Sequence, residues 1–257
     1  GVAQDNVRYT VRNEFGTSQL PGRFNLTDRH HFAMTSDGRF IDGSGEACEW
    51  IHCSSISLAG QRALPGQSAG EWNTIQQEEW PGVTYDHVDR FFEDGSFMTN
   101  YVAVAGRSGG ANYHVSYNRQ DDAGIMPYHK GSLRHNFRVN VDQSVRPNLT
   151  VSASAYFART RTQTQEGNLF QLTRMPAGVD LMAPDPVVDD AIIIKPDPFN
   201  DNVNPLYTMS TAASFQNRGR YLGSVNARWT PLDWFDLDTQ VSYDRLDTMG
   251  ESFRPMG

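Results

Sequence analysis

The chain has 257 residues, enough for one large β domain or two smaller ones. Its net charge of −8 and its lack of a basic run argue against nucleic acid as a partner. Aromatic residues make up 11% of the chain, whereas disordered chains are poor in aromatics. The longest purely aliphatic stretch, residues 191–194, is far too short to cross a bilayer as a helix. The first ten residues show neither the basic segment nor the apolar segment of a signal peptide.

Apolar and polar residues alternate strictly in several long segments of the chain. In residues 132–142, for example, Phe137 belongs to an apolar series and Arg138 to a polar one. A period of two indicates a strand with one apolar and one polar face. The break at residues 143–148 contains Pro147, which favours a turn and predicts a β-hairpin. By this criterion we expect seven strands, near residues 6–15, 97–107, 111–120, 132–142, 149–160, 217–229 and 235–246.

Short and long connections alternate between these strands. The short ones lie near residues 108–110, 143–148 and 230–234, and the long ones cover residues 16–96, 121–131 and 161–216. In an antiparallel up-and-down meander, this order puts the tight turns at one end and the long loops at the other. Outer-membrane barrels have this asymmetry, with tight periplasmic turns and long external loops.

The apolar series of all seven strands contains no charged residue, and its aromatic residues fall toward the strand ends. A soluble β-sandwich also alternates, but its strands are typically about five or six residues long. A transmembrane β-strand needs roughly nine to eleven residues, as the longer predicted strands provide. Aromatic residues at both membrane interfaces are typical of transmembrane barrels. The pattern therefore favours an all-β fold that forms part of a transmembrane barrel with long extracellular loops.

Residues 84–246 resemble the SusC/RagA-like TonB-dependent outer-membrane transporters. The resemblance rests on weak motifs in the right order: Asn100 to Gly106, Tyr113 to Tyr117, Asp122 to Ile125 and Arg138 to Asp142 (R-x-N-x-D). The segments "NPLYT" and "NRGRYLGSVNARWTPLDWFDLDTQVSYDR" are similar to the next hairpin of such barrels. Residues 1–83 match only loosely.

The resemblance implies a bacterial outer-membrane barrel of about 22 strands that imports a bulky nutrient, an oligosaccharide or a peptide. Its implied partners are a SusD-like surface lipoprotein, TonB through a plug segment, the remainder of the barrel, and membrane lipid or lipopolysaccharide. No plug is recognisable in this sequence, so we expect an internal portion of a larger polypeptide. Two alternatives remain, a small autonomous outer-membrane barrel acting as an adhesin or surface protein and a soluble carbohydrate-binding β protein. No catalytic constellation or cofactor motif is found, so we do not predict an enzyme.

Aromatic residues in the long loops are the candidate substrate contacts, because flat rings suit sugar rings and wet interfaces. They are Trp50, Trp72, Trp80, Phe170, Tyr207 and Phe215. The alternative is that these rings pack the loops together or against the lipoprotein.

The polar series carries charged residues that the resemblance places toward the lumen of the barrel. We expect its arginines to pair with its aspartates or with the plug; the residues are Arg134, Arg138, Asp142, Arg228, Asp236 and Asp238. Cys48 and Cys53 are either a small disulfide or two thiols. A metal site that recruits His30, His31 and His52 fits no zinc spacing, so no metal is predicted.

Overall fold

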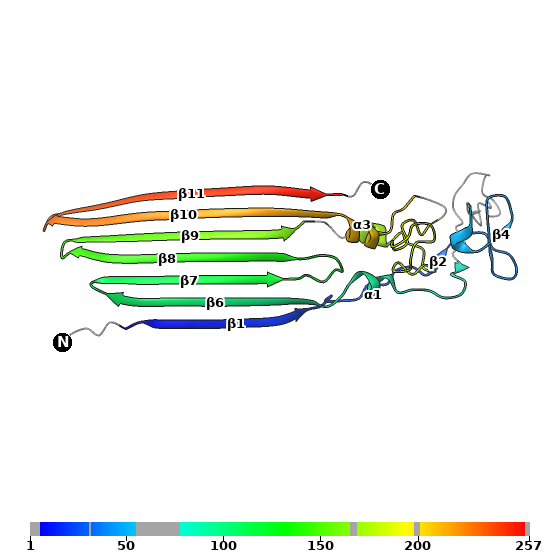
Figure 1. The fold of residues 1–257 in the computed structure, drawn as a ribbon, viewed down its shortest axis with the longest axis horizontal. Coiled ribbons are helices and arrows are strands. Elements are labelled where there is room, and N and C mark those ends of the chain that lie inside the picture. Colours follow the sequence, from blue (N-terminus) through cyan, green and yellow to red (C-terminus); the bar gives the residue numbers. More distant parts are fainter. Residues whose placement is uncertain (1–5, 31, 55–77, 165–168, 198–200, 255–257) are drawn as a thin grey trace, which may run out of the picture.

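The computed structural model describes residues 6–30, 32–54, 78–164, 169–197 and 201–254. Its main feature is one antiparallel sheet of seven strands, the meander that the alternation predicts (Figure 1). The strands are β1 (Arg8–Ser18), β6 (Gly95–Ser108), β7 (Ala111–Asp122), β8 (Ser132–Arg146), β9 (Leu149–Gln163), β10 (Ala213–Leu232) and β11 (Phe235–Phe253).

Each strand pairs with the strand that follows it in the sheet, in the order β1-β6-β7-β8-β9-β10-β11. The three tight turns, β6–β7, β8–β9 and β10–β11, lie together at one end of the sheet, and the three long connections lie at the other (Figure 1). We call these the turn end and the loop end. β1 and β11 form opposite edges of the sheet, so the described sheet is open rather than closed on itself.

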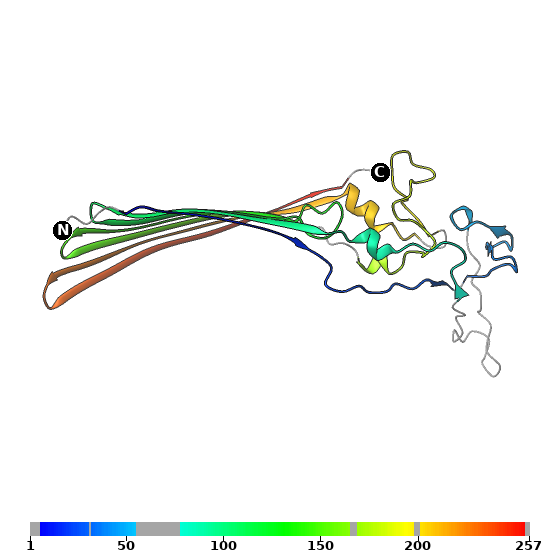
Figure 2. The same ribbon diagram turned by 90° about the horizontal axis from the view of Figure 1, so that it is seen from below.

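The sheet is a single twisted layer, as the edge view in Figure 2 shows. Val11, Val225 and Val241 are 68%, 50% and 68% exposed. An apolar residue of a soluble sandwich would be covered by a second sheet. Among the described segments the only other sheets are the two-residue pairs β2–β5 and β3–β4 at the loop end. Within the described residues, no helix is long and apolar enough to span a membrane.

The strands are longer than their apolar alternation, most clearly at the loop end. β10 has 20 residues and β11 has 19, and both extend several residues beyond the predicted ends. The extra part of β11, residues 247–253, places Asp247 and Glu251 on the face that is apolar further down. A pattern of apolar against polar residues cannot detect a strand whose faces mix both kinds of residue.

The two longest connections fold together into a compact unit at the loop end. Its short strands and helices are β2 (Arg29–His30), β3 (Phe40–Ile41), β4 (Ala47–Cys48), η1 (Trp50–His52), β5 (Glu78–Glu79), α1 (His87–Phe91), α2 (Leu169–Leu172) and α3 (Pro205–Thr211). Two apolar cores hold this unit. The first core contains Phe32, Phe40, Trp50, Cys53, Trp80, Ala177, Val179 and Ile193. The second core contains Phe91, Leu172, Met175, Leu181, Leu206 and Met209.

Both cores combine residues that are far apart in the sequence. The Trp50 indole Nε1 donates to the carbonyl oxygen of Pro196 at 2.9 Å, and the Tyr85 amide donates to Ala177 at 2.8 Å. These bonds join the β1–β6 connection to the β9–β10 connection. The described parts of these two connections are therefore one folded body rather than independent excursions from the sheet.

Asn204 connects three parts of the β9–β10 connection. Its side chain is fully buried, and its Nδ2 donates to the carbonyl oxygens of Leu181 and Ile193, both at 2.8 Å. Its Oδ1 accepts from the Leu206 amide at 3.0 Å, which caps the N-terminus of α3. One amide side chain thus satisfies three backbone groups that would otherwise be buried without partners.

Candidate functional site

The apolar face of the sheet carries a row of aromatic residues across four neighbouring strands. The strand register places them directly opposite one another: Tyr117, Phe137, Phe157 and Tyr221. The Phe157 and Tyr221 rings lie 5.0 Å apart, and the Tyr117 hydroxyl is 2.7 Å from His135 Nδ1. Toward the turn end the same face continues as aliphatic residues, such as Val139 and Val151. Amphipathic rings bordering an apolar band are the arrangement found at a membrane interface.

On the described strands, charged residues appear on the apolar face level with this row and beyond it, toward the loop end. Arg119 lies opposite His135, and His135 lies opposite Arg159. Arg119 is paired with Asp121 at 2.7 Å, and Arg245 is paired with Asp247 at 3.0 Å. On β7 and β9 the face thus changes from uncharged to charged at the next residue of the same face, whereas β8 and β10 carry no Asp, Glu, Lys or Arg side chain there.

The opposite, polar face carries one ion pair near the turn end and another midway along β10 and β11. Arg228 lies 3.1 Å from Asp238, which also accepts from Asn226 Nδ2 at 2.6 Å. Arg220 lies 3.0 Å from Asp244. These groups are largely exposed, so the pairs orient side chains more than they stabilise the fold.

The sequence-based pairing of the other charged residues differs from the contacts in the structure. Arg134 Nε donates to Asn136 Oδ1 at 3.1 Å, and the Arg138 guanidinium lies 5.3 Å from the centre of the Tyr156 ring. Asp236 accepts from the Thr230 hydroxyl at 2.5 Å. Asp142 is four residues from Arg138 along β8, roughly 13 Å at the usual strand rise, and the cross-strand neighbours of Asp142 are Asn112 and Ser152 rather than an arginine. The register between paired strands decides which charged side chains are neighbours. The amino-acid sequence of one strand does not reveal that register.

A concave polar site lies on the polar face near the loop end. It is a cavity of about 410 Å³ formed by β7 to β11, and it is open to the space on that side of the sheet. Arginine supplies most of its charge, through Arg134, Arg218 and Arg220. Alternation shows that Arg218 and Arg220 share a strand face, but only the register brings them near Arg134.

The aromatic residues predicted as substrate contacts do not form one surface. Trp50 and Trp80 are 8% and 9% exposed, and their rings pack 4.7 Å apart in the first loop core. A buried ring cannot offer its face to a substrate. For these two residues, the packing alternative describes the structure.

The remaining candidates are separated from one another. Phe170 on α2 is 67% exposed, and Tyr207 on α3 is half-buried. Phe215 lies on the same face of β10 as Tyr221, with the Arg161 guanidinium 4.2 Å from its ring centre. Phe215 therefore faces away from the polar cavity. Trp72 lies outside the described residues.

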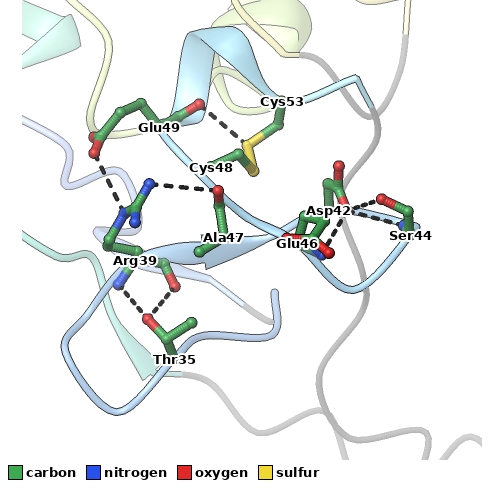
Figure 3. The surroundings of a disulfide bond; sticks show 9 residues. All are labelled: Thr35, Arg39, Asp42, Ser44, Glu46, Ala47, Cys48, Glu49 and Cys53. Carbon is green, nitrogen blue, oxygen red and sulfur yellow. Dashed lines mark hydrogen bonds and ion pairs between the residues drawn. A yellow bond between two sulfur atoms is a disulfide. The ribbon is translucent and has the colours of Figure 1, made fainter.

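Cys48 and Cys53 form a disulfide (Figure 3), and Cys53 belongs to the first loop core. Next to it, Arg39 donates to the Ala47 carbonyl oxygen at 3.4 Å and lies 3.7 Å from the Glu49 carboxylate. The neighbouring turn is closed by Asp42, which accepts from the Ser44 hydroxyl and from the Glu46 amide. These hydrogen bonds lower the pKa of Asp42, the Ser44 bond contributing most. The described residues contain no cluster of three or more metal-ligating side chains.

Comparison with known proteins shows the fold but no family. No protein-family model matches the sequence, and no curated protein matches it. Solved structures share the fold, and two of them illustrate the likeness. The structure of the RagAB peptide importer in the "closed-closed" state aligns with a TM-score of 0.59 and 13% identity, covering 97% of this chain and 29% of that chain. The same importer in the "open-open" state aligns with a TM-score of 0.60 and 16% identity, covering 99% of this chain and 29% of that chain.

Proposed function

We propose that the chain is part of the wall and external loops of a TonB-dependent outer-membrane transporter of the SusC/RagA type, which imports a bulky nutrient. The observation that carries this proposal is the apolar face, which is uncharged, exposed and bordered by the aromatic row. Such a face is stable in hydrocarbon and costly in water. The shared fold supports it, because both similar structures are of a peptide importer. Of the two nutrient classes, peptides are therefore favoured over oligosaccharides.

The open edges of the sheet require further strands. A transmembrane sheet cannot leave backbone groups of an edge strand in hydrocarbon, where each unsatisfied group costs several kcal/mol. We therefore propose that the remainder of the barrel pairs with β1 and β11. The polar face then lines the lumen, and the loop unit lies outside the cell. The chain spans 29% of the length of the similar chains, which leaves room for further wall strands and a plug.

Partners follow from this placement. We propose a SusD-like lipoprotein against the loop unit, TonB through the plug segment, and lipid or lipopolysaccharide around the apolar face. Arg119 and Arg159, just beyond the aromatic row, are placed to meet the phosphates of the outer-leaflet lipids. Transport powered through TonB needs no bond-making chemistry from this chain, and we propose no enzymatic activity for it.

Uptake tests the proposal directly. The gene for the full-length protein is deleted from its bacterium. Growth on a peptide mixture and on oligosaccharides is then measured with and without a plasmid copy of that gene. We expect growth on one nutrient class to be lost on deletion and restored by the wild-type gene but not by a gene whose TonB-contacting segment is removed. Fractionation must also place the protein in the outer membrane. Unaltered growth on every nutrient, or recovery in the soluble fraction, contradicts the proposal.

A further inference from the structure

The polar cavity contains two arginines on either side of one small residue. Thr160 on β9 lies opposite Arg134 on β8, and on its other side it lies opposite Arg218 on β10. Neighbouring strands are about 4.8 Å apart, so the two arginine Cα atoms are separated by roughly 10 Å. Both side chains rise from the same face as the Thr160 hydroxyl. Two guanidinium groups and one hydroxyl can therefore reach a single group placed above Thr160.

Neither arginine has an acidic partner among the described residues. Arg134 donates to the neutral oxygens of Asn136 and Tyr156, and Arg218 donates to Gln216 Oε1 at 3.5 Å. The third arginine of the cavity, Arg220, is already paired with Asp244. One carboxylate lines the cavity, that of Asp122, and it accepts from the Gly124 amide at the loop end. The positive charge of Arg134 and Arg218 is thus left for a ligand.

The floor of the cavity leaves room for that ligand. Ala158, one row closer to the turn end than Thr160, is 7% exposed and carries only a methyl group. Tyr156 closes the lower side, where its hydroxyl is already used by Asn136 at 3.0 Å. Arg134 and Arg218 are both exposed. Their guanidinium groups can make paired N–H bonds to a planar anion without first leaving a buried site.

We propose that Arg134, Thr160 and Arg218 form a subsite for a carboxylate group of a peptide. The inference rests on the proposed function, which makes this face the lumen wall just below the external loops. A peptide that enters from outside meets this subsite before it reaches the rest of the channel. An aspartate or glutamate side chain, or the carboxyl end of a peptide, supplies the required planar anion.

Binding by the purified full-length protein in detergent tests the subsite. The probes are two matched pentapeptides, acetyl-Ala-Ala-Asp-Ala-Ala-amide and acetyl-Ala-Ala-Asn-Ala-Ala-amide, which differ only in the charge of the central side chain. We expect the wild-type protein to bind the Asp peptide about tenfold more tightly than the Asn peptide at low salt. The preference should shrink in 1 M salt, because these groups are exposed. The R134Q/R218Q double variant should bind both peptides equally.

Arg161→Gln is the matched control, because Arg161 follows Thr160 on β9 but lies on the opposite face. This variant should keep the wild-type preference. Thr160→Trp fills the space between the arginines without removing charge, and it should abolish the preference while heat-modifiable migration on gels shows an intact barrel.

Equal wild-type affinities for the two peptides overturn the subsite, as does an unchanged preference in the double variant. Binding of trigalacturonate with no binding of either peptide overturns the assignment to peptides. The proposed function is judged separately by the growth assay. If the deletion strain fails to grow but the wild-type protein binds both peptides equally, the subsite alone is rejected. If the deletion strain grows normally but the protein still prefers the Asp peptide, the transport function alone is rejected.

Discussion

Val139 on β8 lies directly opposite Val115 on β7, while the next residue of β8, Asn140, lies opposite His114. Adjacent residues of β8 therefore lie on opposite faces of the sheet, one on the apolar face and one on the polar face. Val139 belongs to the uncharged band on the turn-end side of the aromatic row, whereas Asn140 belongs to the polar face. Neighbouring positions can thus be compared at the same depth and in the same strand.

Replacing Val139 with Arg should destabilise the inserted protein by about 2–4 kcal/mol, because a charge near the bilayer midplane loses its hydration. Val151→Arg should act similarly. Asn140→Arg is the control and should change stability little, since it faces the polar side. Urea unfolding of the full-length protein in lipid vesicles measures these differences. Equal effects of Val139→Arg and Asn140→Arg would rule out lipid contact.

The sheet could be predicted from the sequence because one of its faces is apolar and the other polar, and side-chain alternation records that difference. The loop unit could not. Its cores join residues as distant as Trp50 and Ile193, and no local pattern links them. Trp80 was a reasonable substrate candidate by residue type, but its environment depends on this long-range packing. The subsite residue Arg218 escaped prediction for a similar reason, since its relation to Arg134 exists only through the register of three strands.

Replacing Asn204 with Ala should destabilise the loop unit by about 3 kcal/mol or more. The substitution leaves the carbonyl oxygens of Leu181 and Ile193 and the Leu206 amide buried without partners. Hydrogen exchange of residues 169–197 measures the local free energy of opening. Asn148→Ala, at an exposed position in the β8–β9 turn, should change it by less than about 0.5 kcal/mol. Normal protection of the loop unit in the Asn204 variant would contradict the role assigned to this side chain.

Removing the Cys48–Cys53 disulfide should weaken the first loop core locally. The two cysteines are separated by 5 positions, and loop-closure entropy for so short a ring corresponds to about 2 kcal/mol. The Cys48→Ser/Cys53→Ser variant should be cleaved faster than wild type by trypsin at Arg39, while the sheet stays resistant. Reductant should reproduce the effect in wild type and add nothing in the variant. Unchanged cleavage after complete reduction would mean that the aromatic packing alone holds this segment.

Acidification should loosen the loop unit through His87. This side chain is buried, and its Nε2 donates to the Val179 carbonyl oxygen at 2.9 Å, a contact that links α1 to the other long connection. Burial lowers the pKa of His87 below 6.5, although the Val179 bond and the nearby Asp180 carboxylate both oppose that shift. The unfolded segment therefore takes up a proton at a higher pH than the folded one does. It follows that stability is complete above about pH 6.5 and falls as the pH drops toward the folded pKa.

Near-UV circular dichroism of the full-length protein should report this loosening, because Trp50 and Trp80 pack in the same core as Val179. The signal should be constant above about pH 7 and should decline in mild denaturant as the pH falls below 6.5. His87→Gln can keep a hydrogen bond to Val179 but cannot be protonated, so its denaturation midpoint should vary less between pH 7.5 and pH 5.5 than that of wild type. His129→Gln is the control, since His129 lies in the β7–β8 connection outside both cores, and it should retain the wild-type pH dependence. If His87→Gln keeps the full pH dependence, another group is responsible and the buried imidazole is only a packing element.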